Sequence, residues 1–137
     1  MTIANNLYID AVVIKGSPRT FTVSINQLAE NQTEFEPFDL SEYYIRFRVL
    51  GSATADALVL IEKNITQSSD ENTTGIITAA SNGQFSFVIT EEDTDVLGVG
   101  KFPISLEIMD IETDGLVHML TEGGYNGEFN KLQVVQV

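Results

Sequence analysis

The chain has 137 residues, of which 43% are hydrophobic, and its 20 acidic and 7 basic side chains give a formal charge of −13. This length suits one domain with a single core, and the absence of Cys excludes disulfides and thiolate metal sites. The negative charge argues against nucleic acid and anionic membrane surfaces as partners, because phosphate groups bind to clustered Lys and Arg.

The N-terminal segment, residues 1–14, contains NNLYIDAVVI, which is apolar on both faces of an extended chain. A strand of this kind is either central in its own fold or covered by another molecule. The segment lacks the basic start and long apolar run of a signal peptide, and no part of the chain reaches transmembrane length. We therefore expect an N-terminal strand or arm at 1–14, ahead of a domain at 15–137, in a soluble protein made in the cytoplasm.

Alternation of apolar and polar residues dominates the rest of the chain, as in strands with one buried face. Four runs each form one apolar row: Phe21, Val23 and Ile25; Tyr43, Ile45, Phe47 and Val49; Phe85, Phe87 and Ile89; Phe102, Ile104, Leu106 and Ile108. Less regular runs occur at 7–14, 57–63, 74–79, 116–121 and 128–137. The sequence thus predicts an all-β protein of about eight or nine short strands, a number typical of a β-sandwich.

Turn signals separate these runs. Asn82-Gly83 predicts a tight hairpin, Asn126-Gly127 a turn into the last strand, and the polar segment 64–75 a long loop. The segment TEEDTDVLG predicts one short helix near 91–97, capped by Thr90 and ended by Gly98. Leu97 is expected to point into the core.

The segment DIETDG, residues 110–115, has the D-x-E-x-D-G spacing with which calcium loops begin. Counting from Asp110, the twelfth position is Thr121 instead of the bidentate Glu that a calcium loop requires. Strand-like runs flank the segment on both sides, so a β-hairpin with Asp114-Gly115 in its turn is the preferred interpretation.

Other chemistry-bearing residues lack the context that a site needs. The acidic run at 91–95 could hold a hard cation, but a solvated first turn of a helix explains it better. His118 is the only histidine, and with no Cys it cannot complete a Cys-His pair or a three-His zinc site. No serine or glycine pattern matches a nucleophile elbow or a phosphate loop. We predict no catalytic, cofactor-binding or metal-binding residue, and no enzymatic activity.

The order of motifs resembles a family of small immunoglobulin-like domains in structural proteins of tailed bacteriophages, which includes the N-terminal domain of upper baseplate proteins and related short virion proteins. The resemblance covers about residues 15–135. It depends on an Asp-Leu-Ser segment before an aromatic strand, then a strand ending in Thr, a short acidic helix, and a Gly and an aromatic residue opening the next strand. The matching residues are Asp39, Leu40, Ser41, Thr90, Thr94, Leu97, Gly100 and Phe102.

This resemblance implies an immunoglobulin-like antiparallel β-sandwich and a non-enzymatic role in the virion. The first hypothesis is a capsid decoration or cement protein, because a small acidic single domain that ends right after its last strand suits a role repeated on a shell. The alternative is a tail, neck or baseplate component in a ring or trimer. A carbohydrate-binding adhesion module ranks lower, since Trp is absent and Tyr is scarce.

The implied partners are other virion proteins, capsid or tail subunits, with the chain as a homo-oligomer or in many copies; nucleic acid and membrane are not expected. The apolar terminal strands could pair within the domain or dock onto a neighbouring subunit. The residues expected at such protein contacts are Leu7, Tyr8, Ile9, Val13, Tyr44, Val135 and Val137.

Overall fold

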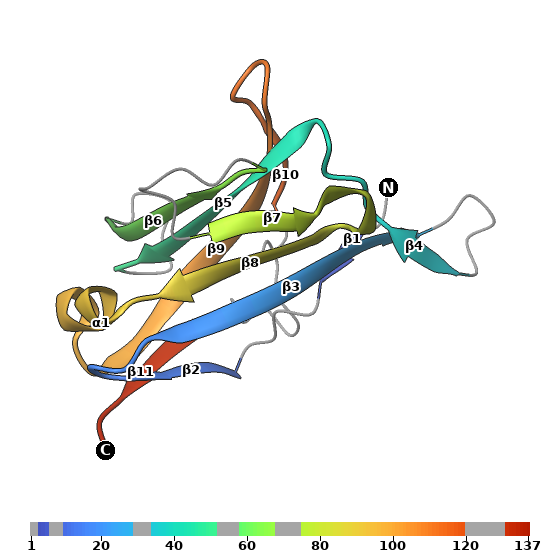
Figure 1. Ribbon diagram of the computed structural model, residues 1–137. Helices are drawn as coiled ribbons and strands as arrows, with labels where there is room; N and C mark the ends of the chain where they lie inside the picture. Colours follow the sequence, from blue (N-terminus) through green and yellow to red (C-terminus); the bar gives the residue numbers. More distant parts are fainter. Residues whose placement is uncertain (1–2, 6–9, 29–33, 52–57, 68–74, 120–130) are drawn as a thin grey trace.

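The computed structural model of the chain describes residues 3–5, 10–28, 34–51, 58–67, 75–119 and 131–137. These residues form two packed layers of strands, with one short helix at an end of the sandwich (Figure 1). The first sheet has five strands: β1 (Ile3–Asn5), β3 (Arg19–Leu28), β4 (Phe35–Pro37), β7 (Gly75–Ala79) and β8 (Gln84–Ile89). The second has six: β2 (Asp10–Ile14), β5 (Tyr43–Leu50), β6 (Val59–Ile65), β9 (Gly100–Asp110), β10 (Leu116–Met119) and β11 (Lys131–Val135).

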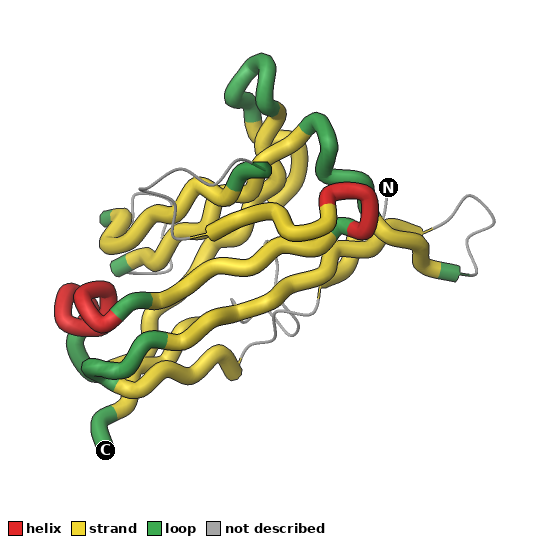
Figure 2. Tube along the Cα trace, in the orientation of Figure 1, coloured by secondary structure: helices red, strands yellow, loops and turns green. Residues whose placement is uncertain are grey.

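The strand order is that of a variable-type immunoglobulin domain. One sheet runs β1-β3-β8-β7, which corresponds to strands A-B-E-D, and the other runs β11-β9-β5-β6, which corresponds to G-F-C-C′. The predicted immunoglobulin-like sandwich is therefore confirmed. Strands dominate the tube in Figure 2, and the structure adds two three-residue strands, β1 and β4, that show no alternation in the sequence.

Among the strands of the described residues, one pair is parallel. β2 lies alongside β11, with Val13 opposite Val134, while the other strand pairs are antiparallel. A parallel pair cannot be joined by a short hairpin, and here nearly the whole domain connects the two strands. Residues 10–14 of the expected N-terminal arm thus belong to the six-stranded sheet.

The alternating rows predicted from the sequence meet between the two sheets. Ile45, Phe47 and Val49 of β5 are at most 1% exposed, as are Phe85 and Phe87 of β8. Each such side chain contributes roughly 1.5–3 kcal/mol by leaving water. The rows of β3 and β9 are buried in the same core, except that Phe102 is only partly buried.

Phenylalanine rings occupy the centre of this core. The Phe47 ring of one sheet and the Phe87 ring of the other have centroids 4.5 Å apart, and Phe21 stacks on Phe87 at 5.4 Å. Such ring pairs add roughly 0.5–1.5 kcal/mol each beyond their burial. The chain has neither Cys nor Trp, so the core packs around this aromatic cluster without the inter-sheet disulfide and the Trp that antibody domains have.

The predicted helix is present as α1 (Glu91–Leu97). Thr90 caps it and forms a capping box with Asp93, which satisfies two backbone N–H groups that have no partner within a helix. Leu97 packs against the core as expected, and Gly98 ends the helix. The fully buried residue of the helix is Thr94, whose hydroxyl accepts from the Gly16 N–H at 2.9 Å.

The turn predicted at Asn82-Gly83 joins β7 to β8, but it is wider than a two-residue hairpin turn. A short 3₁₀ helix, η1 (Ala80–Asn82), precedes Gly83, which has φ +67°. A Cβ atom at this glycine would lie 2.3 Å from the Ile25 carbonyl oxygen and 2.6 Å from that of Phe38. Two other predicted segments, the centre of the 64–75 loop at 68–74 and Asn126-Gly127, lie outside the described residues.

Candidate protein-contact surface

The calcium-like segment at 110–115 is the turn of the β9–β10 hairpin, as the sequence predicted. The Asp110 carboxylate accepts hydrogen bonds from the backbone N–H groups of Glu112 (2.8 Å) and Thr113 (3.1 Å). Asp114 has φ +53°, a left-handed conformation that Asp and Asn adopt more readily than other residues with a Cβ. The hairpin interpretation therefore explains the spacing of the acidic residues through backbone geometry.

Beside this turn, the outward-facing residues of β5 form a row of Tyr44, Arg46 and Arg48. Arg46 makes a two-pronged hydrogen-bonded ion pair with Glu107 of β9, with both N–O distances 3.0 Å. This bonding to Glu107 raises the pKa of Arg46 above its usual value. Arg48 pairs with Glu62 of β6 at 2.7 Å. Both guanidinium groups are thus engaged within the sheet.

Tyr44 ends the row next to the hairpin turn. Its hydroxyl donates a hydrogen bond to the Asp114 carboxylate at 3.2 Å. Partial burial raises the pKa of the Tyr44 phenol, and the hydrogen bond to Asp114 raises it further. Tyr44 and Asp114 therefore present an aromatic ring and a carboxylate to the same region.

A hollow of about 540 Å³ opens at this point, in the size range of ligand and side-chain pockets. Its walls come from β5, the end of β6 and the β9–β10 turn, and they are formed by Tyr44, Asn64, Thr66, Gln67, Ile111 and Asp114. The Gln67 amide donates to the Ser41 carbonyl oxygen at 2.8 Å and so fixes one wall. We name these six residues the Tyr44 hollow.

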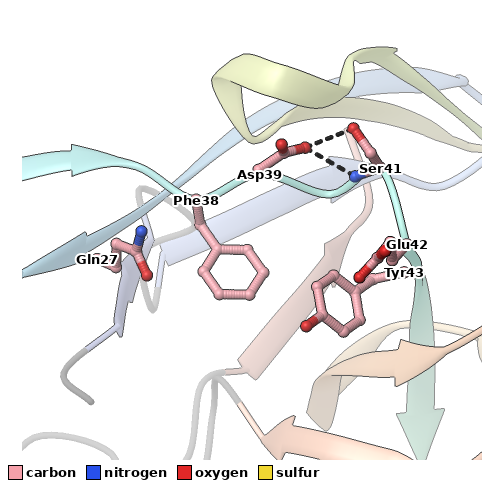
Figure 3. A pocket seen from close by; sticks show the side chains of 6 residues that line it. All are labelled: Gln27, Phe38, Asp39, Ser41, Glu42 and Tyr43. Carbon is pink, nitrogen blue, oxygen red and sulfur yellow. Dashed lines mark hydrogen bonds between the residues drawn. The ribbon is translucent and has the colours of Figure 1, made fainter.

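A second hollow, of about 400 Å³, is lined by residues of β3, of the β4–β5 connection and of the start of β5 (Figure 3). The rings of Phe38 and Tyr43 face it, with centroids 5.5 Å apart. The Asp39 carboxylate accepts from the Ser41 hydroxyl and from the Ser41 N–H (2.9 Å), as the dashed lines show. These bonds lower the pKa of Asp39. The two bonds from Ser41 hold the Asp39 carboxylate in a local turn. Asp39 therefore has a structural role in this hollow that requires no ligand.

The β9–β10 hairpin carries exposed aliphatic side chains, and one of them, Ile111, lines the Tyr44 hollow. Ile111 is 49% exposed, Leu116 51% and Val117 44%. Single exposed aliphatic residues are ordinary, but these three belong to one hairpin, with Ile111 in the wall of the hollow and Leu116 and Val117 at the start of β10. Together with the Tyr44 hollow they form what we call the hairpin surface.

The structure separates the residues that the sequence placed at protein contacts. Tyr44 is part of the hairpin surface, and Val137 is 98% exposed at the other end of the chain. Val13 is 1% exposed and packs in the core, so it is not available to another molecule, and Val135 is half-buried in β11. Leu7, Tyr8 and Ile9 lie outside the described residues.

One charged residue with a structural role was not predicted from the sequence. Lys63 lies in the inward-facing row of β6 with Ile61 and Ile65, and its side chain is 5% exposed. Its ammonium is 2.7 Å from the Asp93 carboxylate on α1, so an ion pair ties the edge strand to the helix. A lysine in the apolar phase of LIEKNI is the sequence signal that could have predicted a buried partner.

The described part of the chain has neither a metal-binding cluster nor a membrane-spanning helix. No group of three or more His, Cys, Asp or Glu side chains there could hold a metal ion. No helix within the described ranges has the length and apolar character to cross a membrane.

Comparisons with known proteins add little to this description. No family model and no curated protein matches the chain. Among solved structures, one similar chain is described as the three-dimensional structure of the NK cell receptor Nkp44, a triggering partner in natural cytotoxicity. It is 14% identical, with a TM-score of 0.43, over 93% of this chain and 97% of that one.

Proposed function

We propose that this chain is a non-enzymatic structural protein of a tailed-bacteriophage virion, which decorates the capsid through protein–protein contacts. The virion context comes from the resemblance at Asp39, Leu40, Ser41, Thr90, Thr94, Leu97, Gly100 and Phe102. The observation that carries a contact role is the hairpin surface, which combines the Tyr44 hollow with three exposed aliphatic side chains of the same hairpin. Interfaces of this kind use a buried aromatic or aliphatic centre within a polar rim.

The charge of the chain suits this role. With 20 acidic side chains against 7 basic ones, copies on a shell repel one another when they meet in wrong orientations. Three of the seven basic residues, Arg46, Arg48 and Lys63, are already bound to carboxylates within the domain. The complementary partner surface is therefore basic.

The test is quantitative mass spectrometry of purified particles after heads and tails have been separated. Decoration predicts copy numbers in the hundreds in the head fraction. A few copies to a few dozen in the tail fraction would replace decoration with a tail, neck or baseplate role. Absence from both fractions would remove the virion proposal.

A further inference from the structure

The Tyr44 hollow combines three kinds of group that suit one type of side chain. The Tyr44 ring and the half-exposed Ile111 side chain supply apolar walls, and Asp114 supplies a carboxylate held beside the ring by the Tyr44 hydroxyl. Asn64 and Gln67 add amide groups to the rim. A planar cation can stack on an aromatic ring while it donates hydrogen bonds to a carboxylate.

The local charge favours such a cation. Asp110, Glu112 and Asp114 all belong to the hairpin turn. Arg46, the basic residue two positions from Tyr44 on β5, is bound through two hydrogen bonds to Glu107. Within the described part of the chain, Asp114 forms no ion pair. Its negative charge is therefore open to a cation from outside the domain.

We propose that the Tyr44 hollow receives an arginine side chain from a basic partner protein, whose apolar residues cover Ile111, Leu116 and Val117. Arginine fits better than lysine, because its flat guanidinium can stack on Tyr44 and reach Asp114 at once. A second copy of this acidic chain is disfavoured, since it would bring a like-charged turn to the same place. The inference rests on the proposed function as a contact protein and names the chemistry of the partner.

The experiment is a titration of the isotope-labelled full chain followed by two-dimensional ¹H–¹⁵N NMR. The probe is the capped tripeptide acetyl-Leu-Arg-Leu-amide, and the reference probes carry Gln or Glu in place of Arg. We expect chemical-shift changes confined to the start of β5, the end of β6 and the 110–117 hairpin. The Arg peptide should bind more tightly than either reference, and added salt should weaken it because the contact is partly electrostatic.

Variants of the hollow test the assignment of groups. Asp114→Asn keeps a residue that tolerates the left-handed backbone and removes the charge, so affinity should fall roughly two- to fivefold. Asp95→Asn is the matched control, since Asp95 is exposed on α1 at the far end of β9 and its replacement should leave affinity unchanged. Tyr44→Ala should weaken binding by a similar factor through loss of the ring. Tyr44→Phe, which keeps the ring, should weaken it less.

Three results would overturn this inference: equal binding of the Gln peptide, shift changes elsewhere on the domain, or an equal loss of affinity in Asp95→Asn. Shift changes in the hollow with methyl glycosides and none with the Arg peptide would overturn it in favour of a sugar site. Failure of the virion proposal can be distinguished from failure of this inference. In that case the protein would be absent from particles, but the Arg peptide would still bind to the Tyr44 hollow. A chain present in particles that ignores the Arg peptide would refute only the arginine assignment.

Discussion

The ion pair between Lys63 and Asp93 should respond differently to loss of each partner. Lys63 is 5% exposed, and Asp93 is its ion-pair partner at 2.7 Å among the described residues. Asp93 is 16% exposed and also accepts a hydrogen bond from the Thr90 N–H at 2.8 Å. Without its partner, Lys63 is therefore a buried charge with little access to water, whereas Asp93 keeps a backbone donor and some solvent.

These contacts determine how much each substitution should lower the free energy of unfolding. Removing one partner of a buried pair costs about 3–5 kcal/mol. We expect Asp93→Asn to lower the free energy of unfolding by about 3 kcal/mol, at the lower end, because the amide oxygen still faces the ammonium. Lys63→Met keeps the length of the side chain and leaves the partly exposed Asp93 carboxylate hydrogen-bonded to the Thr90 N–H, so a loss of about 1–2 kcal/mol is expected. The double variant should resemble Lys63→Met, because no buried ammonium remains.

Urea unfolding at neutral pH measures the free energy of unfolding of the wild type, the two single variants and the double variant. The slope m is compared among the four proteins. The control is Glu62→Gln, the same change of acid to amide in the pair with Arg48, where side-chain exposures of 29% and 40% limit the loss to below about 1 kcal/mol. If Asp93→Asn costs no more than Lys63→Met, the buried ammonium of Lys63 is not the source of the loss. The same conclusion follows if the double variant is less stable than Asp93→Asn.

Three further predictions concern backbone and polar contacts. Gly83→Ala should lower the free energy of unfolding by at least about 3 kcal/mol, because the new Cβ would collide with backbone oxygens. Gly16 has φ +82° but open space around it, so Gly16→Ala should lower the free energy of unfolding by only about 1–2 kcal/mol. Thr94→Val should lower it by about 1–3 kcal/mol in urea unfolding, since the Gly16 N–H loses its acceptor; an unchanged midpoint would contradict the contact. Because hydrogen bonds from Ser41 lower the folded pKa of Asp39, the carboxylate should stabilise the fold above its ordinary pKa of about 4 and stop doing so as the pH falls through the lowered value. Thermal unfolding against pH should therefore show a difference between wild type and Asp39→Asn that disappears in acid, and a constant difference would refute it.

Elements with a strong local signal were predictable from the sequence. The apolar rows of β3, β5 and β8 follow the period of a strand with one buried face, so alternation alone assigns Phe47 and Phe87 to the core. The α1 helix carries its own capping box at Thr90 and Asp93, which act within one turn. Asp114-Gly115 likewise identified the hairpin through backbone preference alone.

The contact residues were less predictable, because apolarity does not reveal which apolar strands are covered. Val13 and Val137 both lie in apolar terminal segments. The parallel pairing of β2 with β11 buries Val13, whereas Val137 follows the end of β11 and is 98% exposed. Only the pairing of two segments more than a hundred residues apart in the chain distinguishes these two positions.

The sequence by itself determined the fold class, the α1 helix and the absence of disulfides, because alternation, caps and composition act over a few residues or over the chain as a whole. The tertiary structure alone decided that Lys63 meets Asp93 and that Tyr44 shares a hollow with Asp114. Both contacts join residues that are far apart in the sequence and that folding brings together. No local sequence pattern indicates which distant residues meet in this way.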